Sequence, residues 1–197
     1  MPTPDAPRIA WRVFPWNPGA PAGEPFSPDW VPPAQGQGRF DLPGTPGGVI
    51  YVAETQVHAI AEMIQHYRGQ HLEDADLTFA GHPFAIARAV IAKGVSDGLA
   101  DLCDPTLLAE LGIRPDETAS ADRRATQGIA ARIHGLGYHG LRWWSAFRGE
   151  WHTLVLFRSR LEDGLRFEPP EPLSLSHAAV IQSMRELGVV RSVPDSR

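Results

Sequence analysis

The stretch that determines the fold is residues 38–62, GRFDLPGTPGGVIYVAETQVHAIAE. Arg39 and an aromatic residue open it, a turn rich in proline and glycine follows, and the β-branched run 49–52 predicts a strand. A helix is expected to begin at once, with Thr55 as its N-cap. Apolar residues three and four positions apart predict one buried helix face, formed by Val57, Ile60, Ala61, Ile64 and Tyr67. Glu62 lies off that face, grouped with His58 and His66, so its carboxylate is expected to face either bulk water or a cleft beside the strand of Tyr51.

Composition places the chain among soluble proteins of a reducing compartment. Its 197 residues suggest one domain with elaborations, and the single cysteine, Cys103, excludes an intramolecular disulfide. No apolar run approaches the roughly 20 residues of a membrane span, and the N-terminus lacks the features of a secretion signal. The net charge of −5 without a basic run argues against nucleic acid as the main partner. We therefore expect a cytoplasmic protein, and the sequence leaves open whether it forms a homodimer.

The N-terminal quarter, residues 1–48, is rich in proline and glycine and resists regular structure. It also carries three tryptophans, which offer large apolar surfaces for burial, so we expect an irregular segment that is docked on the domain. Residues 8–14 within it predict a short strand. Period-two alternation places Ile9, Trp11 and Val13 on one face of this strand, and Ala10, Arg12 and Phe14 on the other.

The remaining elements mix strands and helices without a regular βαβ rhythm. The patterns predict strands at 84–92, 99–102, 141–144 and 152–157. They predict helices at 105–111, 120–134 and 176–187, the first with Asp104 as N-cap and Pro105 at its first position. This order predicts a single α+β domain with a mixed or antiparallel β core flanked by helices.

Several motifs have ordinary structural explanations. The glycines of 135–140, GLGYHG, match the spacing of a dinucleotide fingerprint, but a helix precedes them and a strand follows, the reverse of that motif. His58, Glu62 and His66 share a helix face, yet no further ligand completes a metal site, and none is predicted. Ser145 is outside any G-x-S-x-G elbow, which argues against a hydrolase triad. Cys103 is expected to be a small core residue.

Taken together, the motifs resemble the RES domain family, which is named for an arginine, a glutamate and a serine. GRF, a glycine-rich turn, YVAET and A-x-A-E on a helix form the first part of the match. TQGIAARIHGLGYHGLRWWS, a loop and HTLVLF form the second. The resemblance covers residues 8–158, leaving 159–197 as a C-terminal extension with one helix.

The resemblance implies a fold similar to ADP-ribosyltransferases, NAD as the substrate, no metal, and an Xre-like antitoxin as partner. It assigns the family arginine, glutamate and serine to Arg39, Glu62 and Ser145. Arg12 and Tyr51 match further NAD-binding positions. Val13 stands where an aromatic is expected beside Arg12, so stacking on nicotinamide is assigned to Phe14, Tyr51 or Trp144.

The chemistry suits these residue types. Cleavage of the nicotinamide–ribose bond has an oxocarbenium-like transition state, which a carboxylate stabilises, while arginine forks bind pyrophosphate. The leading hypothesis is therefore an NAD-cleaving toxin that uses water or phosphate as acceptor. An ADP-ribosyltransferase acting on a protein or nucleotide, and a binding module without turnover, remain as alternatives.

Overall fold

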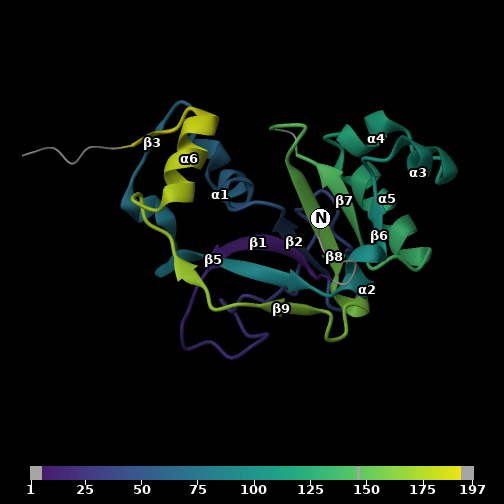
Figure 1. The fold of residues 1–197 in the computed structure, drawn as a ribbon, viewed down its shortest axis with the longest axis horizontal. Coiled ribbons are helices and arrows are strands. Elements are labelled where there is room, and N and C mark those ends of the chain that lie inside the picture. The colour runs from purple at the N-terminus through teal and green to yellow at the C-terminus, as the bar shows by residue number, and fades with distance from the viewer. Residues whose placement is uncertain (1–5, 146, 192–197) are drawn as a thin grey trace, which may run out of the picture.

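A nine-stranded mixed sheet organises the computed structural model, which describes residues 6–145 and 147–191 (Figure 1). Its main path runs in the order β10 (Glu171–Pro172), β5 (His82–Ile91), β1 (Arg8–Pro15), β2 (Val49–Ala53), β8 (His152–Phe157), β7 (Gly140–Trp144) and β6 (Leu99–Asp101). Two further strands, β4 (Thr78–Phe79) and β9 (Leu165–Phe167), pair with β5. β6 pairs with β7 in parallel, whereas the other neighbouring strands of the main path pair in antiparallel fashion. A separate parallel pair joins β3 (His71–Leu72) to β11 (Val190–Arg191).

The helices form two groups on one side of this sheet (Figure 1). One group contains α1 (Gln56–Ile64) and α6 (Ala178–Leu187), and the other contains α3 (Pro105–Glu110), α4 (Pro115–Ala119) and α5 (Arg123–Gly135). The short helix α2 (Lys93–Asp97) follows β5, and three 3₁₀ turns lie at 65–67, 74–77 and 158–160. Within the described ranges, no helix has both the length and the apolar character that a membrane crossing needs.

The predicted α+β architecture is confirmed, and most element boundaries agree within a few residues. Thr55 caps α1 as expected, because its hydroxyl accepts a 3.1 Å hydrogen bond from the amide of His58. The helix predicted for 55–67 ends at Ile64 and tightens into a 3₁₀ turn. The sequence patterns missed α2, α4 and the two-residue strands, which are too short to show a periodicity.

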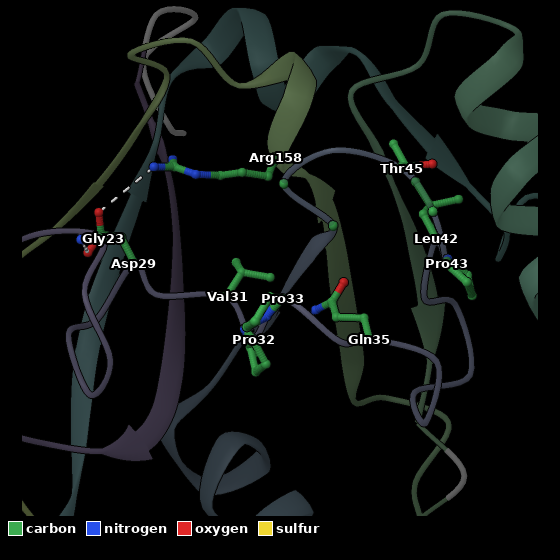
Figure 2. Close-up of a pocket in the computed structure, with 13 residues that line it drawn as sticks. Gly23, Asp29, Val31, Pro32, Pro33, Gln35, Leu42, Pro43, Thr45 and Arg158 are labelled. Atoms are coloured by element: carbon green, nitrogen blue, oxygen red, sulfur yellow. Dashed lines mark hydrogen bonds and ion pairs between the residues drawn. The ribbon is translucent and has the colours of Figure 1, made fainter.

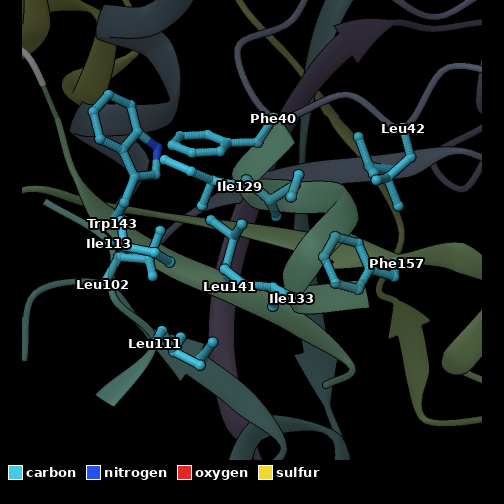
Figure 3. Close-up of a cluster of buried hydrophobic side chains, with 14 of the residues drawn as sticks. Phe40, Leu42, Leu102, Leu111, Ile113, Ile129, Ile133, Leu141, Trp143 and Phe157 are labelled. Carbon is cyan, nitrogen blue, oxygen red and sulfur yellow. The ribbon is translucent and has the colours of Figure 1, made fainter. Parts of the chain in front are cut away.

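Each helix group packs on the sheet through its own apolar cluster. Beneath α5, a cluster built from both sheet and helix residues includes Phe40, Ile129, Leu141, Trp143 and Phe157 (Figure 3). The rings of Phe40 and Trp143 lie 5.3 Å apart at 60° in this cluster. A second cluster joins α1 and α6 to the strand face that carries Trp11 and Val13. Between the two helix groups the sheet surface is not covered by helices, and a cleft opens there.

On the opposite face of the sheet, a third apolar cluster joins residues of β1, β2, β5 and β8 to Val95 and Leu161, and Val31 of the N-terminal segment packs against it. Residues 16–48, all of them described, form turns and bends without a helix or strand. The segment contacts β2 through Gln35, whose side chain accepts from the amide of Val49 at 2.7 Å and donates to its carbonyl at 2.9 Å. A small pocket of about 260 Å³ lies beside this segment, where Arg158 reaches to within 3.8 Å of Asp29 (Figure 2).

The predicted division into an N-terminal segment, a core and a C-terminal extension stays a prediction. Residues 1–5 of the first part and 192–197 of the last lie outside the described residues. The described part of the extension is integrated with the rest, because the hydroxyl of Ser183 on α6 donates a 2.8 Å hydrogen bond to the carbonyl of Val57 on α1.

Candidate active site

A cleft of about 620 Å³ opens on the sheet face between the two helix groups. Its floor is the region where β1 meets β2 at Trp11 and Ala53, and Glu62 of α1 lines one side. Arg39 and Trp143 line the other side, together with Arg123 at the first position of α5. This volume is within the range of roughly 300–1,000 Å³ that is typical of small-molecule sites.

The loop that carries Arg39 is held by a buried carboxylate. Asp41 accepts hydrogen bonds from the amides of Gly36 and Gly38, both at 2.7 Å, and another from the Tyr51 hydroxyl at 2.9 Å. Gly38 leaves no room for a side chain, since an added Cβ would lie 2.4 Å from Asp41 Oδ1 and 2.5 Å from the Tyr51 hydroxyl. The glycine and tyrosine of the GRF and YVAET motifs thus belong to one hydrogen-bonded unit.

Arg39 is anchored to the second helix group and directed along the cleft. Its Nη2 donates to the carbonyls of Thr118 and Ser120 at 2.7 and 2.9 Å, and its guanidinium lies 4.3 Å from the ring centre of Trp143. Burial lowers the pKa of Arg39, whereas the charge of Glu62 opposes that shift. The buried Nε has no hydrogen-bond partner in the part of the chain that the structure describes. Arg39 is therefore a cation with a fixed position on the cleft wall, and a guanidinium group is well suited to bind an anion there.

Tyr51 lines the cleft, but its hydroxyl is already engaged. It donates to Asp41 and accepts a 3.0 Å hydrogen bond from the amide of Phe40. Burial, followed by the charge of Asp41, raises the pKa of Tyr51 far above its ordinary value. The phenol therefore stays protonated and braces the arginine loop, while its ring forms part of the cleft wall.

Glu62 is oriented by two side-chain donors. Its Oε1 lies 3.0 Å from Nε2 of His58, one helical turn earlier, and accepts a 3.2 Å hydrogen bond from the hydroxyl of Ser145. Its Oε2 receives a longer 3.4 Å contact from Gln65. The side chain is 40% exposed and lines the cleft. The carboxylate is therefore fixed by donors on the protein side and is accessible from the cleft.

Ser145 contacts Glu62 from within the protein. It is 3% exposed and is not among the cleft-lining residues. Its amide donates to the carbonyl of Trp151 at 2.6 Å, and its hydroxyl accepts from the amide of Phe147 at 3.2 Å. This geometry favours a role for Ser145 in orienting Glu62 over direct contact with a ribose.

Three predicted pocket residues point elsewhere. The guanidinium of Arg12 donates to the carbonyls of Pro28 and, at 2.8 Å, Trp30, although the residue does border the cleft. Because strand side chains alternate, Arg12 projects to the face opposite Trp11 and Val13. Burial lowers its pKa to about 10, with Asp29 opposing the shift, and the group stays charged at neutral pH. Arg12 anchors the N-terminal segment.

The same alternation places two of the proposed aromatic platforms, Phe14 and Trp144, away from the cleft. Phe14 is 5% exposed and lies on the face of Arg12, and it does not border the cleft. On β7 it is Trp143, not Trp144, that lines the cleft. A two-residue WW pair in a strand must place one ring on each face, and the sequence alone did not show which face is which.

Two further residues, Arg123 and His58, belong to the site although the sequence did not assign them to it. Arg123 at the start of α5 lines the cleft, and the only signal for it was its place in the first turn of a predicted helix. His58 was expected on a polar helix face with Glu62 and His66, but it is fully buried. In the described residues no group of three or more His, Cys, Asp or Glu side chains is arranged to hold a metal ion.

An ion cluster behind the cleft secures the start of α1. Glu54, just before the N-cap, pairs with Arg8, with Arg142 at 3.0 Å and with His152 at 3.1 Å. Burial raises the pKa of Glu54, but its hydrogen bond to Arg142 and the charges of both arginines outweigh that effect and hold the pKa below its ordinary value.

Nearby Cys103 was expected in the core but is half-buried. Burial and then Asp101 raise the pKa of its thiol to about 11, so it stays protonated at neutral pH.

Comparison with known proteins agrees with this picture. The family model described as the RES domain matches residues 9–177, which confirms the resemblance inferred from the motifs. A chain in the crystal structure of the M. tuberculosis MbcT–MbcA toxin–antitoxin complex matches with a TM-score of 0.56. That match has 16% sequence identity and covers 93% of this chain and 91% of the other, so the two share a fold. No curated protein matches.

Proposed function

We propose that this chain, which belongs to the RES domain family, cleaves the bond between nicotinamide and ribose in NAD. The observation that carries the proposal is the Glu62 carboxylate, which two donors hold in place at the edge of a cleft that also contains Arg39. A carboxylate fixed in this way costs little reorganisation when positive charge develops beside it, and such preorganised electrostatics are the main source of enzymatic rate enhancement.

Glu62 is suited to the first step of the proposed reaction, in which positive charge develops on the ribose. As the carbon–nitrogen bond breaks, its electron pair leaves with nicotinamide, and the ribose acquires oxocarbenium character that Glu62 stabilises. The new bond forms between the anomeric carbon and an oxygen of water or phosphate; attacking water gives its proton to solvent. Nicotinamide is a good leaving group because the electron pair that it takes neutralises its positive ring charge, so no strong general acid is required.

Two cations are available for the pyrophosphate. Arg39 offers a guanidinium tethered at one nitrogen, and Arg123 adds a second positive charge on the same wall. Forked guanidinium groups match phosphate oxygens in bidentate geometry. Arg39 and Arg123 are favoured over Arg12, whose guanidinium is already bound to the carbonyls of Pro28 and Trp30. Nicotinamide would then lie toward Glu62, and the ring of Tyr51 is the remaining member of the predicted stacking set that borders the cleft.

The decisive experiment is incubation of the purified protein with NAD, with and without phosphate, followed by mass spectrometry. We expect nicotinamide together with either free ADP-ribose or ADP-ribose phosphate, and the phosphate dependence distinguishes hydrolysis from phosphorolysis. Nicotinamide release that occurs only when a protein or nucleotide is added, with ADP-ribose attached to it, would identify a transferase. Bound but intact NAD would overturn the proposed cleavage in favour of a binding module.

We also propose that an Xre-like antitoxin neutralises the chain. The support is the shared fold with a chain from a structure described as a toxin–antitoxin complex, together with the family membership. Expression in a bacterial host is expected to lower cellular NAD and stop growth, and a bound antitoxin is expected to prevent both effects. Growth and NAD measured in the same cultures test this, and growth arrest at unchanged NAD would contradict it.

A further inference from the structure

The fully buried histidine behind Glu62 carries the next inference. We propose that His58 is a positioning residue, which holds the Glu62 carboxylate in the orientation that faces the substrate. The inference rests on the proposed function, because it assigns a task within the same site. His58 touches neither the cleft nor the expected substrate, so it acts through Glu62 alone.

The geometry of α1 brings the two side chains together. Residues four apart on a helix are neighbours on its surface, and His58 Nε2 lies 3.0 Å from Glu62 Oε1. Since a carboxylate oxygen only accepts, Nε2 must carry the proton and donate. The same oxygen accepts from Ser145 at 3.2 Å, so two donors arriving from different elements converge on one atom. Convergence of this kind restricts the terminal torsion of a side chain that is otherwise 40% exposed.

The loop after β7 braces both donors. Ser145 begins this loop, and Trp151 near its end stacks on the His58 ring, with centroids 5.2 Å apart at 27°. The two ends are joined by the hydrogen bond from the Ser145 amide to the Trp151 carbonyl. Arg148 in the same loop pairs with Glu186 on α6 and lies 5.5 Å from the Trp151 ring centre. Glu62 is therefore clamped by helix and loop together.

Stability alone does not explain a histidine at this position. His58 is 0% exposed, and its Nδ1 has no hydrogen-bond partner among the described residues. A buried polar nitrogen without a partner is unfavourable, and an apolar ring of similar size would pack there without that cost. What histidine adds over an apolar ring is the donor to Glu62. A purely structural role therefore predicts no link between this donor and turnover.

The test compares His58→Phe with His58→Gln. Phenylalanine keeps a ring against Trp151 but removes the donor, whereas the glutamine amide places a donor at a similar reach. We expect His58→Phe to lower kcat for NAD cleavage about tenfold with KM nearly unchanged, since hydrogen bonds to charged groups are the stronger kind. We expect His58→Gln to recover most of that loss. The thermal midpoint of His58→Phe should be equal to or above that of the parent.

His66→Phe is the matched control, because His66 is exposed and lies two turns further along, outside the cleft. Equal kcat for His58→Phe and the parent would overturn the proposal, and so would equal losses in the Phe and Gln variants. Crystal structures of the variants give a readout that does not depend on NAD. We expect Glu62 Oε1 to leave Ser145 in His58→Phe and to stay in His58→Gln. If the parent protein cleaves no NAD, the proposed function fails, and these structures still decide whether His58 positions Glu62.

Discussion

Glu62→Gln is expected to lower the turnover of NAD by about 10²–10³-fold while the thermal midpoint stays close to that of the parent. The amide oxygen of glutamine can still accept from His58 and Ser145, the two groups that contact Oε1. The fold and the orientation of the side chain are therefore preserved. What disappears is the negative charge that faces the developing oxocarbenium ion, and that interaction is stronger in the transition state than in the ground state.

The measurement is nicotinamide release at saturating NAD, which separates turnover from binding. Glu168→Gln is a matched control, because Glu168 is a carboxylate paired with Arg88 at 2.7 Å and lies outside the cleft. We expect the control to retain the parent rate. If Glu62→Gln were as active as the parent, Glu62 would have no role as the charged group of the reaction.

Arg39→Ala is expected to weaken NAD binding about a hundredfold, with a smaller effect on the rate of bound substrate. Removing one partner of a buried, hydrogen-bonded charge pair typically costs about 2–5 kcal/mol, and the lower half of that range corresponds to this factor. The structural reason is that Arg39 lines the cleft and that the carbonyls of Thr118 and Ser120 hold its guanidinium in place. Calorimetric titration of Glu62→Gln with NAD, with and without the Arg39 substitution, measures the affinity without turnover.

The variant Arg39→Lys tests whether a positive charge at this position is sufficient for NAD binding. Lysine keeps the positive charge but lacks the planar fork, so it cannot donate to the carbonyls of Thr118 and Ser120 and to a phosphate in the same way. We expect an affinity between those of the parent and the alanine variant. Arg114→Ala controls for lost charge, since Arg114 is exposed and pairs with Asp116. Unchanged affinity in Arg39→Ala, with a folded protein by circular dichroism, would remove Arg39 from the binding site.

Much of the fold could be predicted because its signals are local. The β-branched run before Thr55, the cap itself and the spacing of Ile60 and Ile64 specify β2 and α1 within a span of about 15 residues. Asp104 and Pro105 likewise mark the start of α3, where the aspartate accepts from the Thr106 amide at 2.8 Å. Such features depend on hydrogen bonds and torsions among residues that are close in the sequence. A short sequence window therefore contains all the residues that determine them.

The sequence did not decide the positions of side chains that could face either the cleft or another part of the protein. Arg12 and Phe14 lie on the correct strand, but the face that they occupy depends on which side of the sheet the helices cover. His58 has the periodicity of a polar face, but Trp151, almost a hundred residues later in the sequence, stacks on its ring and encloses it. Neither outcome follows from spacing, because both depend on contacts between distant parts of the chain.

The amino-acid sequence by itself determined the α+β class, the principal strands and helices, and the motifs that identify the family. Only the tertiary structure decided that Tyr51 braces the arginine loop, that Ser145 and His58 converge on one oxygen of Glu62, and that Arg123 joins Arg39 on the cleft wall. The physical reason is that backbone preferences act over a few residues, whereas the orientation of a buried polar group is determined by partners that only folding brings within hydrogen-bonding distance.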